Sequence, residues 1–233
     1  MKRPILIGII VIIIVGFLLY KPAQVFLQKI WADKGLTKET GQELLPEEKI
    51  TMPKTLEGKN IAMVITFREF RDIEYFIPKN ILQGAGAKIV TVSSQKGTAV
   101  GADGGEVNVD QDFSGFQAED FDAVVFIGGP GMAKRLDDES FHKIAQDTVK
   151  ADRVLGAICV SPALLANAGV LSGKKATVWS APLNKETIKI LKENGAIYED
   201  KTVVVDGKIV TGNGPGAAKE WAEAITEVLI SQY

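Results

Sequence analysis

The only cysteine of this 233-residue chain, Cys159, lies between a short apolar segment and a predicted helix. Residues 154–158 (VLGAI) are typical of a buried strand, and residues 162–168 are typical of a helix that ends at Gly169. A sharp turn between two such elements raises the side chain above the carboxyl edge of a sheet and directs the first amides of the helix at it. We therefore expect a nucleophilic thiol with partial thiolate character. The alternative is a small core residue, since free cysteine is among the most buried residue types.

The composition of the chain limits the kinds of site to which this thiol can belong. The chain is 46% hydrophobic and 24% charged, with a formal net charge of -2 and charges of both signs scattered along it. This composition favours a globular domain and gives no basic surface for nucleic acid. One cysteine and one histidine, His142, exclude an intramolecular disulfide and argue against a Cys- or His-based metal site. We expect no cofactor.

Strands alternate with helices through most of the chain. The strands are predicted at residues 61–66, 88–93, 123–127, 154–158, 175–179, 202–205 and 209–211, the helices at residues 73–83, 140–150, 162–168, 185–194 and 217–231, and a hairpin or strand excursion at residues 98–109. This alternation implies a parallel sheet with helices on both faces, a flavodoxin-like α/β sandwich. Ligands of such sheets bind beyond the carboxyl ends of the strands, so the segments that follow the strands should form the site.

Five short motifs, in order along the chain, resemble the ThiJ/PfpI (DJ-one/PfpI) superfamily of class I glutamine amidotransferase-like proteins. They are Glu74 followed by Pro78 (E-x-x-x-P), the pair Gly128-Gly129, the elbow Ala157-Ile158-Cys159 with Pro162 (A-I-C-x-x-P-x-x-L), the run Leu171 to Lys175, and Gly214-Pro215-Gly216. The resemblance covers residues 59–229. It implies the fold of that superfamily and a functional Cys159.

The resemblance also implies that Glu74 lies against Cys159, and that amides at Gly128-Gly129 and Val160 form an oxyanion hole. A protonated Glu74 would donate a hydrogen bond to the thiolate, so we expect a raised pKa for Glu74 and a lowered one for Cys159. The plainer alternatives are a carboxylate favoured at a helix N-terminus and an ordinary tight turn at the glycines. The other expected pocket residues are Ser161, Trp179, Ser180 and Asn213.

The departures from the superfamily concern histidine. Members are described with a histidine directly after the cysteine or after the next strand, but here those places hold Val160 and residues 178–182, which include none. His142 is expected to be a surface residue of the helix that precedes the elbow strand. Cys–His catalysis within one chain is therefore predicted to be absent, which argues against a cysteine peptidase or amidase. A glutamine amidotransferase would need a late His-x-Glu, which the sequence lacks.

Two functions remain compatible with these residues. One is a thiol enzyme of the glyoxalase or deglycase type, acting on small reactive carbonyls or their adducts, with Cys159 as nucleophile and Glu74 as general acid and base. The other is a non-enzymatic redox sensor or protective protein, in which an oxidant converts Cys159 to sulfenic and then sulfinic acid. Because superfamily members are commonly dimers, the resemblance also implies a homodimer.

The start of the chain differs from the rest. Lys2 and Arg3 precede an unbroken apolar run at residues 5–20, which as a helix would cover roughly 24 Å of a bilayer core of about 30 Å. We expect residues 1–27 to be a single-pass transmembrane signal anchor, with a cytoplasmic N-terminus and the rest on the extracytoplasmic side. A cleaved signal peptide is the alternative. Residues 28–58 are predicted to be a linker ahead of a domain at residues 59–233.

Overall fold

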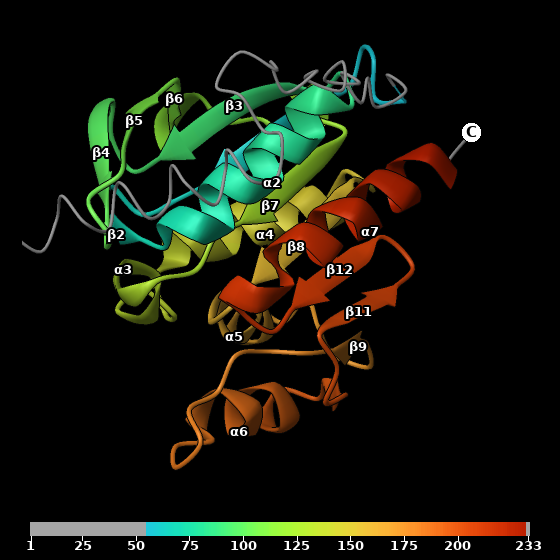
Figure 1. Cartoon of the computed structure of the whole chain (residues 1–233). Helices are drawn as coiled ribbons and strands as arrows, with labels where there is room; N and C mark the ends of the chain where they lie inside the picture. Colours follow the sequence, from blue (N-terminus) through green and yellow to red (C-terminus); the bar gives the residue numbers. More distant parts are fainter. Residues whose placement is uncertain (1–54, 232–233) are drawn as a thin grey trace, which may run out of the picture. The chain divides into compact units, whose positions relative to one another are not determined.

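The computed structural model describes residues 55–231, all within one compact unit (Figure 1). The predicted membrane anchor and nearly all of the predicted linker lie outside the described residues. Within residues 55–231, no helix combines the length and apolar character needed to cross a bilayer. Leu56, in the last part of the predicted linker, is fully buried and its N–H donates to the carbonyl of Ala85 at 2.9 Å, so the packed core includes it.

A seven-stranded sheet forms the centre of this unit, in the order β11-β12-β8-β7-β1-β3-β6. Its strands are β1 (Asn60–Val64), β3 (Lys88–Ser93), β6 (Gln111–Asp112), β7 (Ala123–Phe126), β8 (Val154–Ile158), β11 (Val203–Asp206) and β12 (Ile209–Gly212). Neighbouring strands are parallel except for the pair β11 and β12 at one edge. The predicted parallel sheet is confirmed, with an antiparallel strand added at its edge.

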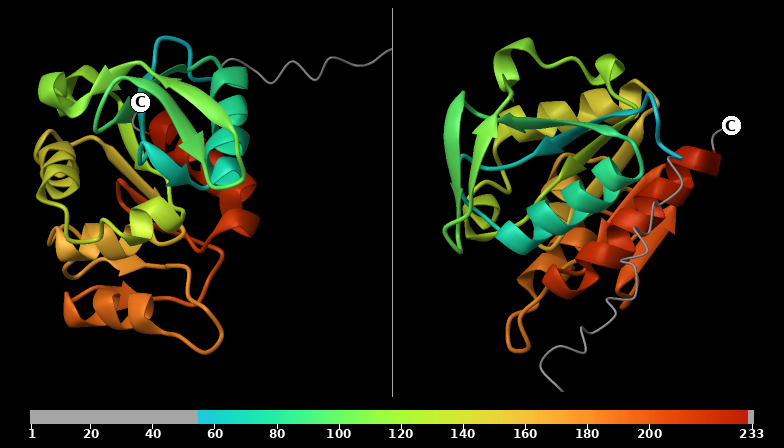
Figure 2. Two further views of the ribbon diagram at one scale, coloured as in Figure 1. Left: turned by 90° about the vertical axis from the view of Figure 1, so that its left-hand side faces the viewer. Right: turned by 45° about the horizontal axis from the view of Figure 1, so that its top comes forward.

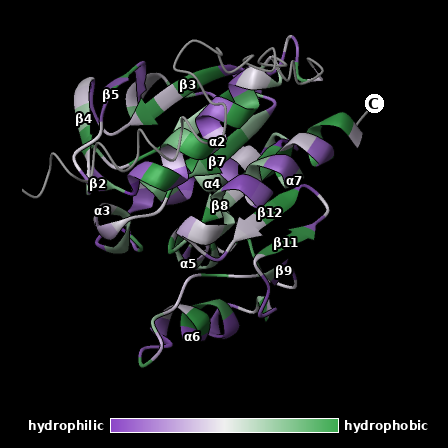
Figure 3. Cartoon of the chain, in the orientation of Figure 1, coloured by the Kyte–Doolittle hydropathy of each residue, from purple (hydrophilic) through white to green (hydrophobic). Residues whose placement is uncertain are grey.

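Helices cover both faces of this sheet (Figure 2). The helices α2 (Asp72–Gly84) and α7 (Ala218–Ser231) pack together on one face, and α4 (Glu139–Lys150) and α5 (Ser161–Asn167) on the other. Hydrophilic and hydrophobic residues mix along α2 and α7, as expected of helices with one face in water (Figure 3). Because both faces are covered, the inner strands β7 and β8 are buried at every position, which explains their continuous apolar sequences. This is the flavodoxin-like sandwich that the sequence predicts.

Two glycines let α7 approach the sheet beneath the elbow. The largest fully buried side chain, Trp221 of α7, donates from Nε1 to the carbonyl of Val210 at 3.0 Å. A Cβ on Gly156 of β8 would lie 3.0 Å from the Trp221 ring, and one on Gly212 of β12 would lie 3.2 Å from it. The absent side chains therefore make room for the indole, which packs against β8 and β12.

Two small sheets lie beside the main one. The first contains β2 (Arg68–Phe70), β4 (Gly97–Gly101) and β5 (Glu106–Val109), and so confirms the predicted hairpin and adds a strand that the sequence did not predict. The second pairs β9 (Lys175–Ala176) with β10 (Ile197–Tyr198). The remaining α-helices of residues 55–231 are α3 (Pro130–Ala133) and α6 (Glu186–Glu193), and three short 3₁₀ helices lie at Phe113–Gly115, Ala118–Asp120 and Pro215–Ala217.

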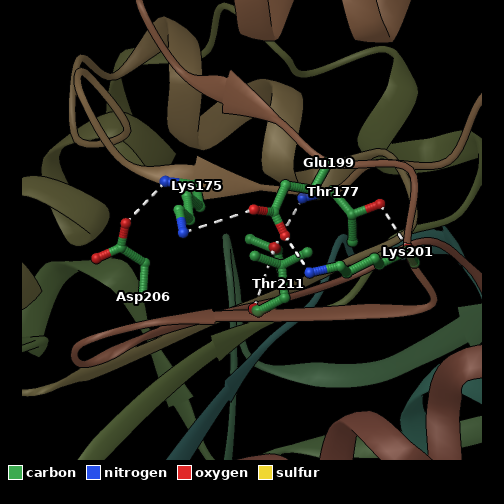
Figure 4. Close-up of polar contacts among 7 residues, drawn as sticks. Lys175, Thr177, Glu199, Lys201, Asp206 and Thr211 are labelled. Carbon is green, nitrogen blue, oxygen red and sulfur yellow. Dashed lines mark hydrogen bonds and ion pairs between the residues drawn. The ribbon is translucent and has the colours of Figure 1, made fainter.

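The strand predicted at residues 175–179 is wrong beyond its second residue. After Ala176 the N–H of Thr177 donates to a side chain, Oγ1 of Thr211, at 2.9 Å, in place of a strand carbonyl (Figure 4). Two residues later the N–H of Trp179 donates to the carbonyl of Cys159 at 2.8 Å. The chain thus leaves the small sheet early and brings Trp179 to the elbow.

Candidate active site

Cys159 occupies a strained turn between β8 and α5. Its φ of 64° lies in the left-handed region, which is unfavourable for a residue with a side chain. The N–H of Cys159 donates to the carbonyl of Gly212 at 2.9 Å, and its carbonyl accepts from Trp179. These two hydrogen bonds tie the turn to both neighbouring segments, so the surrounding structure holds the strained conformation. The predicted elbow is present.

Glu74, in the first turn of α2, is the buried carboxylate nearest to this chemistry. Its side chain is fully buried, and neither carboxylate oxygen has a hydrogen-bond partner of normal geometry. A Cβ on Gly128 would lie 2.5 Å from Cβ of Cys159 and 2.8 Å from Oε2 of Glu74. Gly128 therefore lies against both side chains, and the structure brings the thiol and the carboxylate together as the resemblance implies. A carboxylate that served only the helix N-terminus would not need this burial.

Burial raises the pKa of Glu74 to about 7, against the opposing effects of the Cys159 thiol, the positive charge of Arg71 and the peptide N–H of Gly128. The expected raised pKa of Glu74 is thus present. The pKa of Cys159 is also raised, first by burial and then by the negative charge of Glu74, although the N–H groups of Gly129 and Val160 act to lower it. The expectation of a lowered pKa for Cys159 is therefore wrong, because the sequence does not show how deeply the turn is buried.

The two raised pKa values describe a pair that holds one proton over a wide range of pH. The first proton leaves near pH 7, and the second leaves only well above the ordinary range of a thiol. Near neutral pH, both the protonated and the ionised form of Glu74 are therefore populated beside a protonated sulfur. It can accept the proton of Cys159 as the sulfur forms a new bond, and can return that proton later.

The glycine pair brings a second segment of backbone to the site. Gly129 has a φ of 116°, and a Cβ there would lie 2.5 Å from the backbone nitrogen of Arg71 and 2.6 Å from the carbonyl oxygen of Glu69. The N–H of Arg71 donates to the carbonyl of Gly128 at 3.0 Å. Because the pair has no side chains, its backbone packs against the end of β2 while the N–H of Gly129 and that of Val160 face the sulfur. These are the donors expected for an oxyanion hole.

A pocket of about 260 Å³ opens over Cys159. Its lining residues are Arg71, Gly129, Pro130, Ala133, Cys159, Val160, Trp179 and Pro215. A larger cavity of about 510 Å³ also borders α3, but Cys159 does not line it. The smaller pocket is therefore the candidate site.

Of the four further residues expected in the pocket, only Trp179 lines it. Ser161 is fully buried in the first turn of α5, and its hydroxyl has no hydrogen-bond partner. Ser180 accepts from Nζ of Lys185 at 3.2 Å, and the N–H of Asn213 donates to the carbonyl of Thr202 at 2.9 Å. The three are neighbours of the site in sequence, but their positions in the fold lie outside its lining.

Sequence reasoning missed Arg71, the charged residue of the lining. It follows β2, whose three residues include Glu69 with a φ of 61°, and such a short, strained strand gives no periodic apolar pattern. The only available signal was its place just before α2, three positions ahead of Glu74.

His142 does not belong to the site. It lies on α4, half-buried, where Nε2 makes a hydrogen bond with the carbonyl of Leu136 at 2.8 Å. The expectation of a surface histidine is corrected in this respect, because the ring packs against the segment before α4. Within residues 55–231, no three His, Cys, Asp or Glu side chains gather closely enough to hold a metal ion.

Comparison with known proteins agrees with this geometry. The model of the DJ-1/PfpI family matches residues 59–228. An uncharacterised protein of Methanocaldococcus jannaschii is 38% identical over 167 residues, which are 71% of this chain and 80% of that protein. A protein of Pyrococcus horikoshii named as a deglycase is 31% identical over 168 residues, 72% of this chain and 98% of that protein. The crystal structure of a ThiJ/PfpI domain protein from Brachyspira murdochii superposes with a TM-score of 0.71 at 36% identity, covering 75% of this chain and 98% of that one.

Proposed function

The chain belongs to the DJ-1/PfpI family, and we propose that it is a cysteine-dependent enzyme of the glyoxalase or deglycase type, acting on small reactive carbonyls or their adducts. Relatives named as deglycases support this class of reaction. The observation that carries the proposal is Glu74, fully buried, without a hydrogen-bond partner of normal geometry, and with a pKa raised to about 7 beside Cys159. General acid and base catalysis is most effective when the pKa of the group is close to the working pH.

The reaction begins with attack of the Cys159 sulfur on an aldehyde carbon. A carbon–sulfur bond forms, the carbonyl electron pair moves to oxygen, and the thiol proton moves to Glu74. The N–H groups of Gly129 and Val160, which face the sulfur, then lie beside the developing oxyanion and stabilise it. Glu74 next protonates that oxygen, which gives a hemithioacetal and restores the carboxylate.

With an α-oxoaldehyde, two further protons move. Glu74 removes the hydrogen from the hemithioacetal carbon, which gives an enediol intermediate, and returns that proton to the neighbouring carbon. The hydroxyl of the first carbon passes its proton to the neighbouring oxygen as it becomes the thioester carbonyl, which leaves a 2-hydroxy thioester on Cys159. Water hydrolyses the thioester to a 2-hydroxy acid and frees the thiol. The aldehyde carbon is oxidised and its neighbour is reduced, so the reaction consumes one water and no external oxidant.

A redox-sensing function is the second candidate. The same N–H groups of Gly129 and Val160 that lower the pKa of Cys159 would bind the oxygens of a sulfenic or sulfinic acid at this sulfur. The oxidant would supply the oxygen atoms. In this case the site would accept oxygen once and would not turn over.

A cysteine peptidase or amidase is less well supported. The lining of the pocket contains no histidine, and His142 makes its hydrogen bond with Leu136, away from Cys159. Without a Cys–His pair, the sulfur has only Glu74 to accept its proton.

The location and assembly of the protein remain predictions. We propose that residues 1–27 anchor the chain in a membrane with the domain on the extracytoplasmic side, on the strength of the apolar run at residues 5–20. Cleavage of the domain by a protease added outside an intact cytoplasmic membrane tests this orientation, and protection of the domain would contradict it. A homodimer is proposed because members of the family are commonly homodimers.

The decisive experiment measures methylglyoxal consumption by the purified protein together with its intact mass after graded peroxide treatment. The variants are Cys159→Ala and Glu74→Gln, and His142→Gln is the control. Turnover that is abolished by Cys159→Ala, reduced about 10²–10⁴-fold by Glu74→Gln and unchanged in His142→Gln supports the enzyme. No turnover, with addition of two oxygens that depends on Glu74, supports the sensor and rejects the enzyme.

A further inference from the structure

Arg71 is the one charged side chain among the residues that line the cysteine pocket. The rest of the lining consists of glycine, proline, alanine, valine and tryptophan residues. The Arg71 side chain is 31% exposed, so its charge acts on a bound molecule at short range and is partly screened by water. The pocket is thus small, mostly apolar and positively charged at one point.

The guanidinium of Arg71 is held from one side only. Its Nη1 lies 3.1 Å from Oδ1 and 3.2 Å from Oδ2 of Asp103, so a single nitrogen makes both contacts. Nη2 and Nε make no hydrogen bond with the described protein atoms. Because a guanidinium presents its five N–H groups as a rigid fork, the remaining edge is available to a planar anion.

The partner of Arg71 is itself fixed in place. The N–H of Asp103 donates to Oδ2 of Asp72 at 2.8 Å, and the N–H of Gly105 donates to Oδ1 of the same carboxylate at 2.5 Å. Asp72 is the first residue of α2, so the loop between β4 and β5 is pinned to the start of the helix that carries Glu74. The Arg71–Asp103 pair is largely exposed and contributes little to stability, which leaves orientation of the guanidinium as its main effect.

The charge of Arg71 also reaches the reacting pair, since it lowers the pKa of Glu74. A bound anion would otherwise be repelled whenever Glu74 is ionised. Arg71 offsets that repulsion because it lies between the open pocket and the start of α2.

We propose that the free edge of the Arg71 guanidinium binds a carboxylate on the substrate, so that the pocket selects small carbonyl compounds or adducts that carry a carboxylate close to the reacting carbon. The inference rests on the proposed function for the turnover of such substrates, and on the pocket alone for the binding. A carboxylate is the natural partner because its two oxygens match the fork of an arginine.

The first test needs no turnover. Iodoacetate and iodoacetamide both alkylate thiols, with loss of iodide and a proton, and they differ chiefly in the carboxylate. Cys159 is the only cysteine, so intact mass reports its modification directly. We expect the ratio of the iodoacetate rate to the iodoacetamide rate to fall about 10-fold in Arg71→Met, roughly 1.4 kcal/mol, and less in Arg71→Lys, which keeps the charge without the fork.

Lys134→Met is the matched control, because Lys134 pairs with Glu69 and lines the larger cavity instead. Its ratio should equal that of the unmodified protein. An unchanged ratio in Arg71→Met, or an equal fall in Lys134→Met, would overturn the proposal. The ratio cancels changes in the intrinsic reactivity of the thiol, and Arg71→Lys, which keeps a positive charge beside Glu74, separates loss of the fork from loss of the charge.

The second test compares turnover of two methylglyoxal hemithioacetals, one made with N-acetylcysteine and one with N-acetylcysteamine, which lacks only the carboxylate. Arg71→Met should raise KM for the first about 10-fold relative to the second. If neither adduct is turned over but the alkylation ratio depends on Arg71, the enzymatic function fails while the carboxylate site stands. If both are turned over and neither test depends on Arg71, the carboxylate site fails while the enzymatic function stands.

Discussion

Two sets of fully buried polar side chains near the carboxyl end of the sheet differ in their hydrogen bonding. One set is Thr177 and Thr211, and the other is Glu74. Thr177 and Thr211 are as buried as Glu74, yet each hydroxyl has partners. Oγ1 of Thr211 accepts from the N–H of Thr177 at 2.9 Å and donates to the carbonyl of Val204 at 3.4 Å, and Oγ1 of Thr177 donates to the carbonyl of Lys201 at 2.8 Å (Figure 4). Glu74 has only the Cys159 thiol and the N–H of Gly128 beside its carboxylate, neither at normal hydrogen-bond geometry, and burial raises its pKa.

This difference distinguishes a region that stabilises the fold, at the two threonines, from a region that can react, at Glu74 and Cys159. Buried polar groups are normally hydrogen-bonded, and a satisfied pair such as the two threonines stabilises the segment that leads from β9 to Trp179. A buried carboxylate without such partners destabilises the fold, and it does so beside a cysteine in the left-handed region of backbone conformation. The cysteine site thus combines an unsatisfied carboxylate with strained backbone, next to a segment whose buried hydroxyls are hydrogen-bonded.

The largest expected effect concerns stability and pH. Since the pKa of Glu74 in the folded protein, about 7, lies above its ordinary value of 4.5, folding favours the protonated form. The stabilisation is complete below pH 4.5 and is lost as the pH rises towards and through 7. We expect the stability of the unmodified protein, relative to Glu74→Gln, to fall by about 3 kcal/mol between pH 4 and pH 8. Urea unfolding of both proteins across that range measures it, and parallel curves would show that Glu74 is not strained.

The next effect concerns the glycine that separates the two reacting side chains. In Gly128→Ala the new Cβ would clash with Cβ of Cys159, Oε2 of Glu74 and the carbonyl of Ile158, at 2.5, 2.8 and 2.9 Å. Since small misplacements of reacting groups are costly, we expect kcat/KM to fall about 100-fold. Gly84→Ala is the control, because no atom lies within 4 Å of its Cβ position. Equal activity of the two variants would mean that the geometry at Gly128 does not matter to the reaction.

A substitution at the two hydrogen-bonded threonines should lower the stability of the protein and leave its activity unchanged. Thr211→Val keeps the shape of the side chain but leaves the N–H of Thr177 without its acceptor, which should cost about 2 kcal/mol of unfolding free energy. We expect kcat/KM to remain within about twofold, because neither threonine lines the pocket. A large loss of activity without loss of stability would contradict the division drawn between the two regions.

The smallest effect is expected at the exposed rim of the same region. Lys201 pairs with Glu199 at 2.7 Å, but its side chain is 64% exposed, and only its backbone carbonyl contacts Thr177. Lys201→Ala retains that carbonyl, so the urea midpoint and kcat/KM should not change measurably. Urea unfolding of Lys201→Ala and of the unmodified protein at low and high salt checks this. A salt-dependent loss of stability in the variant would show that the ion pair stabilises the fold.

Local patterns predicted much of the fold. Strands β3 and β8 have the bounds that the sequence predicts. Strand β8 is an apolar run buried at every position, and β3 is rich in β-branched residues and is buried in its second half. Strand β2 and helix α3 were missed, since three or four residues are too few to show a period and nothing in the residue type of Glu69 signals its φ of 61°. Strand β9 ends early because a side chain, that of Thr211, takes the place of a strand partner.

The sequence by itself determined the class of fold, the elbow at Cys159 and the candidate status of Glu74, because these depend on short-range patterns and motifs. Only the tertiary structure decided that Arg71 lines the pocket, that Ser161 does not, and that the pKa of Cys159 is raised. Burial and electrostatic interaction sum over every atom around a group, most of them from distant parts of the chain. A local pattern therefore identifies which residues can react, and the packed fold sets how their protons are shared.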